Sequence, residues 1–96
     1  MDIYVTLSRQ SIEPNDGYAY DVARLCTLYA QQVEAAIQTA YPDALVHIET
    51  HPHILRSRVA VDAERLVEED RVQQHVEDLM QQVWANTKWD RFFLVA

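Results

Sequence analysis

The sequence RSRVAVDAERLVEEDRVQQHVEDLMQQVWAN, at residues 56–86, contains two hydrophobic patterns. Apolar residues first recur every two residues and then every three or four residues. Within residues 56–62, Val59 and Val61 share one side of the chain, which predicts a half-buried strand. From about Ala63 to Asn86 the apolar residues follow a helical period, which predicts an amphipathic helix with Asp62 as its N-cap. The apolar stripe of this helix contains Val72, Val76, Leu79, Met80 and Val83, with Trp84 at its edge.

Two further strands are predicted on the N-terminal side of this stretch. Residues 46–50 alternate, with Val46 and Ile48 on one side, and a break follows at residues 51–53. We expect strands 46–50 and 56–62 to form a hairpin with a loop of several residues. Residues 3–7 alternate in the same way and predict the first strand.

A second helical pattern lies between the first two strands. Apolar residues recur at three- and four-residue steps from about Tyr18 to Tyr41, after turn-forming residues at 11–17. We expect Asp16 to be the N-cap, and Pro42 to end the helix because the residue before a proline avoids helical backbone angles.

These elements together predict a single α+β domain over residues 1–96, in the order β-α-β-β-α. Two amphipathic helices can each bury one stripe against the same face of a small sheet. Residues 92–95 are apolar and could form a fourth strand at the C-terminus. The residues expected in the core are Val5, Val22, Tyr29, Val33, Ile37, Ile48, Val59, Val61, Val76, Leu79 and Val83.

Composition narrows the classes of function. The 15 acidic and 8 basic residues give a net charge of −7, which disfavours direct binding to nucleic acid. The same charge suits docking on a basic protein surface, although solubility alone would also explain it. The chain starts without a secretory leader pattern and contains no apolar run of membrane-spanning length, so we expect a cytoplasmic protein that does not enter a membrane.

The sequence contains only weak candidates for a metal-binding or catalytic site. His47, Glu49 and His51 alternate along one strand and are residue types that bind metals, with His53 nearby. We favour a solvated strand face, with Glu49 opposite Arg56 or Arg58, because the spacing does not match that of a zinc site. Cys26 lies on the apolar stripe of the first helix, where a cysteine usually packs as a small hydrophobe. We therefore expect no metal, no cofactor and no enzymatic activity.

Aromatic residues without an evident core position provide no nucleic-acid site. A sheet face with exposed aromatics can stack bases, but it normally accompanies a basic groove, which this acidic chain lacks. We expect these residues to pack against the protein; they are Tyr4, Tyr18, Tyr20 and Trp89.

The second helix carries an acidic side. At 100° per residue, Asp70, Glu77 and Asp78 project opposite the apolar stripe, with Gln74 and Gln81 between them. Glu64, Glu68 and Glu69 add charge near the start of the helix. An ordinary solvated face would have the same pattern, but so would an anionic surface that binds Lys and Arg of a protein partner. The residues expected to bind such a partner are Asp70, Glu77, Asp78, Glu68, Gln74 and Gln81.

Four segments carry a family resemblance. They are MDIYVTL at 1–7, AYPD at 40–43, VHI at 46–48, and Glu69-Asp70 followed by Val76-x-x-Leu79-Met80-x-x-x-Trp84. With these segments the chain resembles the DinI-like proteins, small DNA-damage-inducible regulators of the RecA recombinase. The resemblance implies a β-α-β-β-α domain that binds the RecA filament in the SOS response without chemistry of its own. Asp78 matches an acidic position of the family.

Two other classes of function stay open. One is an inhibitor or immunity protein of a mobile element, which would mimic DNA with the same acidic side and block another DNA-handling enzyme. The other is a ferredoxin-like domain in which residues 92–95 complete a four-stranded sheet and which serves as a homodimer or small carrier. We expect a monomer or a weak homodimer.

Overall fold

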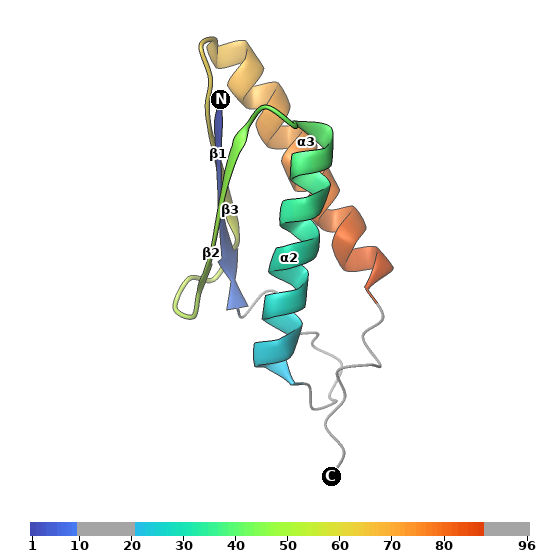
Figure 1. The fold of residues 1–96 in the computed structure, drawn as a ribbon. Coiled ribbons are helices and arrows are strands. Elements are labelled where there is room, and N and C mark those ends of the chain that lie inside the picture. Colours follow the sequence, from blue (N-terminus) through green and yellow to red (C-terminus); the bar gives the residue numbers. More distant parts are fainter. Residues whose placement is uncertain (10–20, 88–96) are drawn as a thin grey trace.

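The structure is a computed structural model that describes residues 1–9 and 21–87. Its elements are β1 (Asp2–Ser8), α2 (Val22–Ala40), β2 (Leu45–His51), β3 (Arg58–Asp62) and α3 (Leu66–Asn86), shown in Figure 1. The predicted α+β class and the order β-α-β-β-α are confirmed. The proposed strand at 92–95 lies outside the described residues, as do Tyr18, Tyr20 and Trp89.

The three strands form a mixed sheet in the order β2-β1-β3. Strand β1 pairs with β2 in parallel and with β3 in antiparallel orientation. The predicted hairpin between β2 and β3 is therefore wrong, because β1 lies between them. Glu49 and Arg58 do not face one another either; both are opposite Thr6, on its two sides.

Strand β1 lies between the other two strands and has the most deeply buried side chains of the sheet. Ile3 and Leu7 are 0% exposed and Val5 is 1% exposed, whereas the inward residues of β2 and β3 are only partly buried.

Residues 52–57 connect β2 to β3 and pass the end of β1. There the buried Ser8 hydroxyl donates a hydrogen bond to the Ile54 carbonyl over 2.7 Å, and the Ser8 N–H donates to Ser57 Oγ over 3.0 Å.

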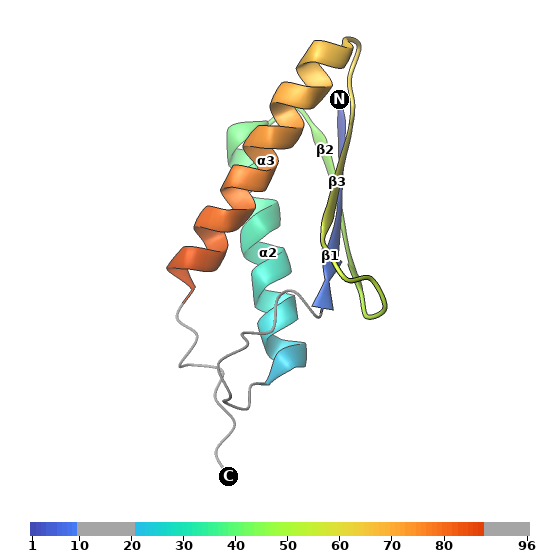
Figure 2. The same cartoon turned by 180° about the vertical axis from the view of Figure 1, so that it is seen from behind.

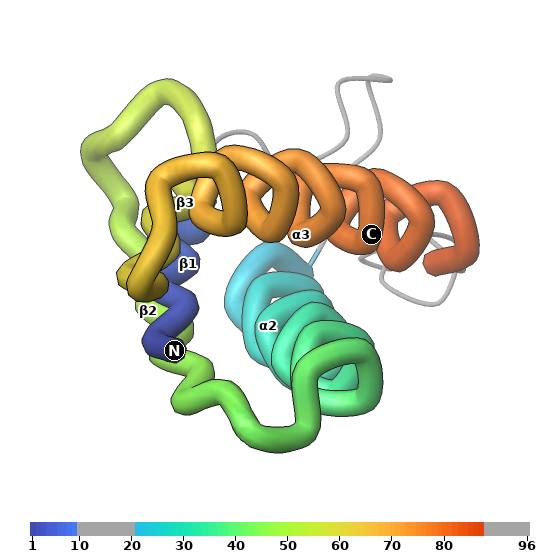
Figure 3. The backbone as a smooth tube through the Cα atoms, turned by 90° about the horizontal axis from the view of Figure 1, so that it is seen from above, coloured from blue at the N-terminus to red at the C-terminus, as the bar shows by residue number. Residues whose placement is uncertain are grey.

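Both helices cover one face of the sheet, as Figures 2 and 3 show from behind and from above. Helix α3 starts beside the end of β3 and diverges from the sheet toward its own C-terminus. All eleven residues expected in the core are buried or pack against it as partly buried residues. The core also contains Ile3, Leu7, Leu25, Cys26, Ala44, Val72 and Met80.

Helix α2 begins later than predicted. It starts at Val22, and Asp21 is the N-cap, whose side chain accepts a hydrogen bond from the Arg24 N–H over 3.3 Å. The expected cap, Asp16, lies outside the described residues. The predicted end is confirmed: the helix stops at Ala40, just before Tyr41 and Pro42.

Helix α3 also begins later than predicted, at Leu66 instead of Ala63. Asp62 is not its N-cap, because this residue ends β3 and is paired with Asp2. The preceding residue, Arg65, makes no capping hydrogen bond with its side chain. Instead the Glu69 carboxylate accepts a hydrogen bond from the Ala63 N–H over 3.2 Å, which ties the first turn to the strand connection.

Candidate protein-binding face on helix α3

Helix α3 has one buried side and one exposed side. Val72, Val76 and Met80 are buried beneath it, and Leu79 and Val83 are partly buried beside them. This is the stripe that the sequence predicts. Every residue on the opposite side of the helix is therefore presented to solvent on a rigid backbone that the core holds in place.

Four of the six predicted binding residues lie together on that exposed side. Asp70, Gln74, Asp78 and Gln81 are all exposed, and their spacing of three or four residues aligns them along the helix. We call these four residues the acidic row. The Gln74 amide donates a hydrogen bond to Asp78 Oδ1 over 3.3 Å, one turn apart. This bond holds the Asp78 carboxylate toward the middle of the row.

The other two predicted residues are less exposed than the acidic row. Glu77 is partly buried and lines a pocket of about 430 Å³ between α3 and β3, next to Met80 and Trp84. Glu68 is also partly buried and belongs to a different pocket, near the N-terminal end of β1. Gln81 lines the same pocket as Glu77, so the structure places Glu77 at the edge of the acidic row and separates only Glu68 from it.

The charge of α3 is strongly negative. Within Leu66–Asn86 the acidic residues are Glu68, Glu69, Asp70, Glu77 and Asp78, against the single basic residue Arg71, so the formal charge is 1 − 5 = −4. Glu68 and Glu69 lie in the first turn, where carboxylates interact favourably with the helix dipole. Asp70 and Asp78 lie beyond the first turn and are exposed.

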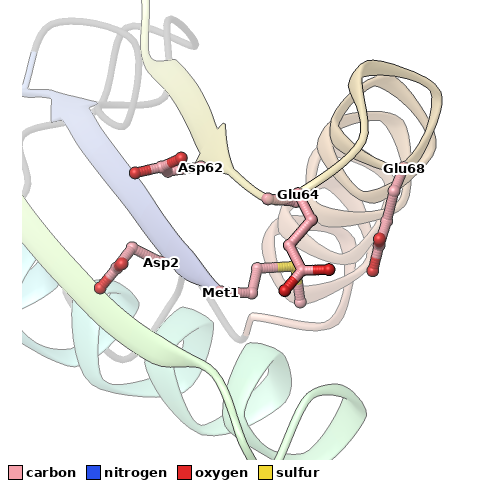
Figure 4. Close-up of a pocket in the computed structure, with 6 residues that line it drawn as sticks. Met1, Asp2, Asp62, Glu64 and Glu68 are labelled. Carbon is pink, nitrogen blue, oxygen red and sulfur yellow. The ribbon is translucent and has the colours of Figure 1, made fainter.

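A second group of carboxylates was not predicted. Asp2, Asp62, Glu64 and Glu68 line an open pocket of about 470 Å³ around Met1 (Figure 4). Asp2 and Asp62 come together because they are paired across β1 and β3. Only the register of β1 and β3 brings Asp2 and Asp62 together. The sequence did not predict this register, because its patterns favoured a hairpin of β2 and β3.

The candidate metal-binding residues lie on the exposed face of the sheet. The His47 ring stacks on Tyr4 with 4.7 Å between ring centroids, and His47 Nε2 lies 3.4 Å from Asp2 Oδ1. His51 and His53 contact one another edge to face at the end of β2. Within residues 1–9 and 21–87, no group of three or more His, Cys, Asp or Glu side chains is placed to hold a metal ion.

Buried polar groups on α2 serve packing. Cys26 is 6% exposed and belongs to the core. The Tyr29 hydroxyl donates a hydrogen bond to the Met80 carbonyl over 3.1 Å, which links α2 to α3. Burial raises the pKa of the Tyr29 phenol to about 12, because the protein interior disfavours the phenolate.

No helix among the described residues is long and apolar enough to cross a membrane. No protein-family model and no curated protein matches the chain. The acidic row is carried by a helix that the core holds in place.

Proposed function

We propose that this chain is a non-enzymatic regulator of the DinI-like kind, which binds a RecA-like recombinase filament through the acidic row of α3. The observation that carries the proposal is the exposure of Asp70 and Asp78 on the side of α3 opposite the core. The family resemblance of residues 69–84 supports the same helix and names the class of partner.

The physical basis is electrostatic complementarity. A filament that binds DNA carries basic side chains, and carboxylates on a rigid helix can pair with the basic side chains that the bound DNA leaves exposed. The packed helix already fixes the backbone that carries these side chains, so binding does not have to order it, which favours association. Charged contacts at the rim of an interface act mainly on the rate of association and weaken as salt screens them.

The test is a titration of labelled protein onto RecA filaments assembled on single-stranded DNA. The Asp70→Lys/Asp78→Lys variant places like charges against a basic surface, so we expect its Kd to rise by about tenfold or more. The variant should fold normally, because substituting an exposed residue outside the core usually changes the free energy of unfolding by less than about 0.5 kcal/mol. The loss should shrink above about 0.15 M salt, where the Debye length is about 8 Å.

Glu34→Lys/Asp43→Lys is the matched control. Both of these residues are exposed and lie outside α3, and the control changes the net charge by the same amount. It should bind nearly as well as the wild type. Equal weakening by both variants would mean that only net charge matters and would contradict the assignment to α3. A wild-type protein that does not bind at tens of micromolar would favour the mobile-element inhibitor instead.

A further inference from the structure

Strand β3 is an edge strand with a self-complementary sequence. It reads Arg58-Val59-Ala60-Val61-Asp62, and among residues 1–9 and 21–87 only β1 pairs with it. Arg58, Ala60 and Asp62 are exposed, whereas Val59 and Val61 are partly buried on the helix side. An edge strand offers backbone N–H and C=O groups to any chain that can align with it.

We propose that β3 pairs with β3 of a second copy of this chain, antiparallel and centred on Ala60. In this register Arg58 of each copy lies opposite Asp62 of the other, and Val59 lies opposite Val61. Both charged pairs are attractive, and both valine pairs are of the β-branched kind that stabilises antiparallel strands. The three-stranded sheet would continue across the two-fold axis into the second copy.

The charges of the monomer favour this pairing. Asp62 is directly opposite Asp2 on β1, and like charges in opposite positions of a sheet repel. Within the described residues neither Arg58 nor Asp62 takes part in an ion pair. Figure 4 shows Asp2 and Asp62 on these neighbouring strands. Asp2 also lies 3.4 Å from His47, whereas the second copy would place the guanidinium of its Arg58 beside Asp62.

The inner side of the edge has room for the second strand. Because α3 diverges from the sheet, an open pocket of about 430 Å³ lies between β3 and the C-terminal half of the helix. Val59, Met80 and the 40% exposed Trp84 line it. In the proposed register the second copy's Val61 is opposite Val59 and faces this pocket, where it would bury apolar surface.

The other edge of the sheet is a poorer interface. An antiparallel pair of β2 strands centred on Ile48 would set His47 against Glu49. That pair is attractive only when the histidine carries a proton, whereas arginine and aspartate are charged at neutral pH. We therefore assign self-association at neutral pH to β3.

The experiment is sedimentation equilibrium of the full chain up to about 1 mM, a concentration suited to a weak interface smaller than about 1,200 Å². We expect a concentration-dependent dimer for the wild type. Arg58→Asp and Asp62→Arg each make both charged pairs repulsive, so each variant should raise the dimer Kd by about tenfold or more. The double variant Arg58→Asp/Asp62→Arg restores both attractive pairs and should dimerise like the wild type.

An equimolar mixture of the two single variants is the sharpest arm. In the mixed dimer the Arg58→Asp chain has an aspartate at both charged positions and the Asp62→Arg chain has an arginine at both. Both cross-strand pairs are then attractive, so the mixture should dimerise when neither variant does alone.

Two controls separate this register from other effects of charge. Circular dichroism melts confirm that each variant is folded. Glu49→Arg and Arg56→Asp change the charge equally at other exposed positions and should leave the dimer intact. A wild-type monomer at every concentration, a mixture that stays monomeric, or a dimer disrupted only by Glu49→Arg would overturn the proposal.

Discussion

At the scale of single residues, Tyr29 shows how one polar group serves both packing and helix orientation. The side chain is 6% exposed, yet its hydroxyl finds an acceptor in the Met80 carbonyl. A buried hydroxyl without a partner would cost free energy, so this contact specifies how α2 and α3 meet. The helical period predicts that Tyr29 is buried, but it does not predict the acceptor, which lies 51 residues away in sequence.

The raised pKa of Tyr29 predicts a pH dependence of stability. The pKa of the phenol is near its ordinary value of 10.0 in the unfolded chain and about 12 in the folded protein. The folded state therefore holds more protons between these values, and the free energy of unfolding should fall as pH rises from 10 to 12. Below pH 10 the contribution is fully present.

Urea unfolding of the wild type and Tyr29→Phe at several pH values checks this expectation. The variant should lose about 0.5–1.5 kcal/mol at pH 7, because the Met80 carbonyl loses a hydrogen-bond donor. It should then lose less stability than the wild type at higher pH. If the free energy of unfolding fell equally for both proteins above pH 10, the pKa of Tyr29 would be the same in the folded and unfolded states, which would contradict this expectation.

At the scale of elements, the local pattern identifies each strand and helix but not all of their ends. The alternation of Val59 and Val61 and the helical period of Val72 and Val76 are clear signals in the sequence. They are clear because these side chains have to be apolar to pack in the core. The starts of α2 and α3 differ from the predicted ones because capping depends on backbone geometry, and Asp62 belongs to β3.

The start of α2 gives a direct prediction. Asp21→Ala should destabilise the domain by about 0.5–2 kcal/mol, because the Arg24 N–H loses its acceptor. Thermal melts of this variant and of Asp16→Ala compare the structural N-cap with the one expected from the sequence. A loss of stability for Asp16→Ala but not for Asp21→Ala would move the start of the helix.

At the scale of the whole molecule, the class and the order of elements are predictable from the sequence, but the strand order is not. A hairpin was the simplest arrangement of β2 and β3, yet the more apolar β1 takes the central position and separates them. The same register places Asp2 beside Asp62, a charge arrangement that local patterns do not contain.

The sequence predicts some residues of the candidate binding face but not the surroundings of the others. Asp70, Gln74, Asp78 and Gln81 are where a 100° helix places them, because the opposite side is buried. Glu68 lines a pocket near the start of β1, and Glu77 and Gln81 line one beside β3, which the helical period alone cannot show. A partner that uses the acidic row should therefore contact the middle of α3.

Site-specific photocrosslinking tests this central claim most directly. A benzophenone side chain is placed either at Gln74, in the middle of the acidic row, or at Gln31, an exposed residue of α2. Each protein is irradiated with RecA filaments assembled on single-stranded DNA. We predict a covalent adduct with RecA from position 74 and little from position 31. No adduct from position 74, or equal yields from both positions, would contradict the account.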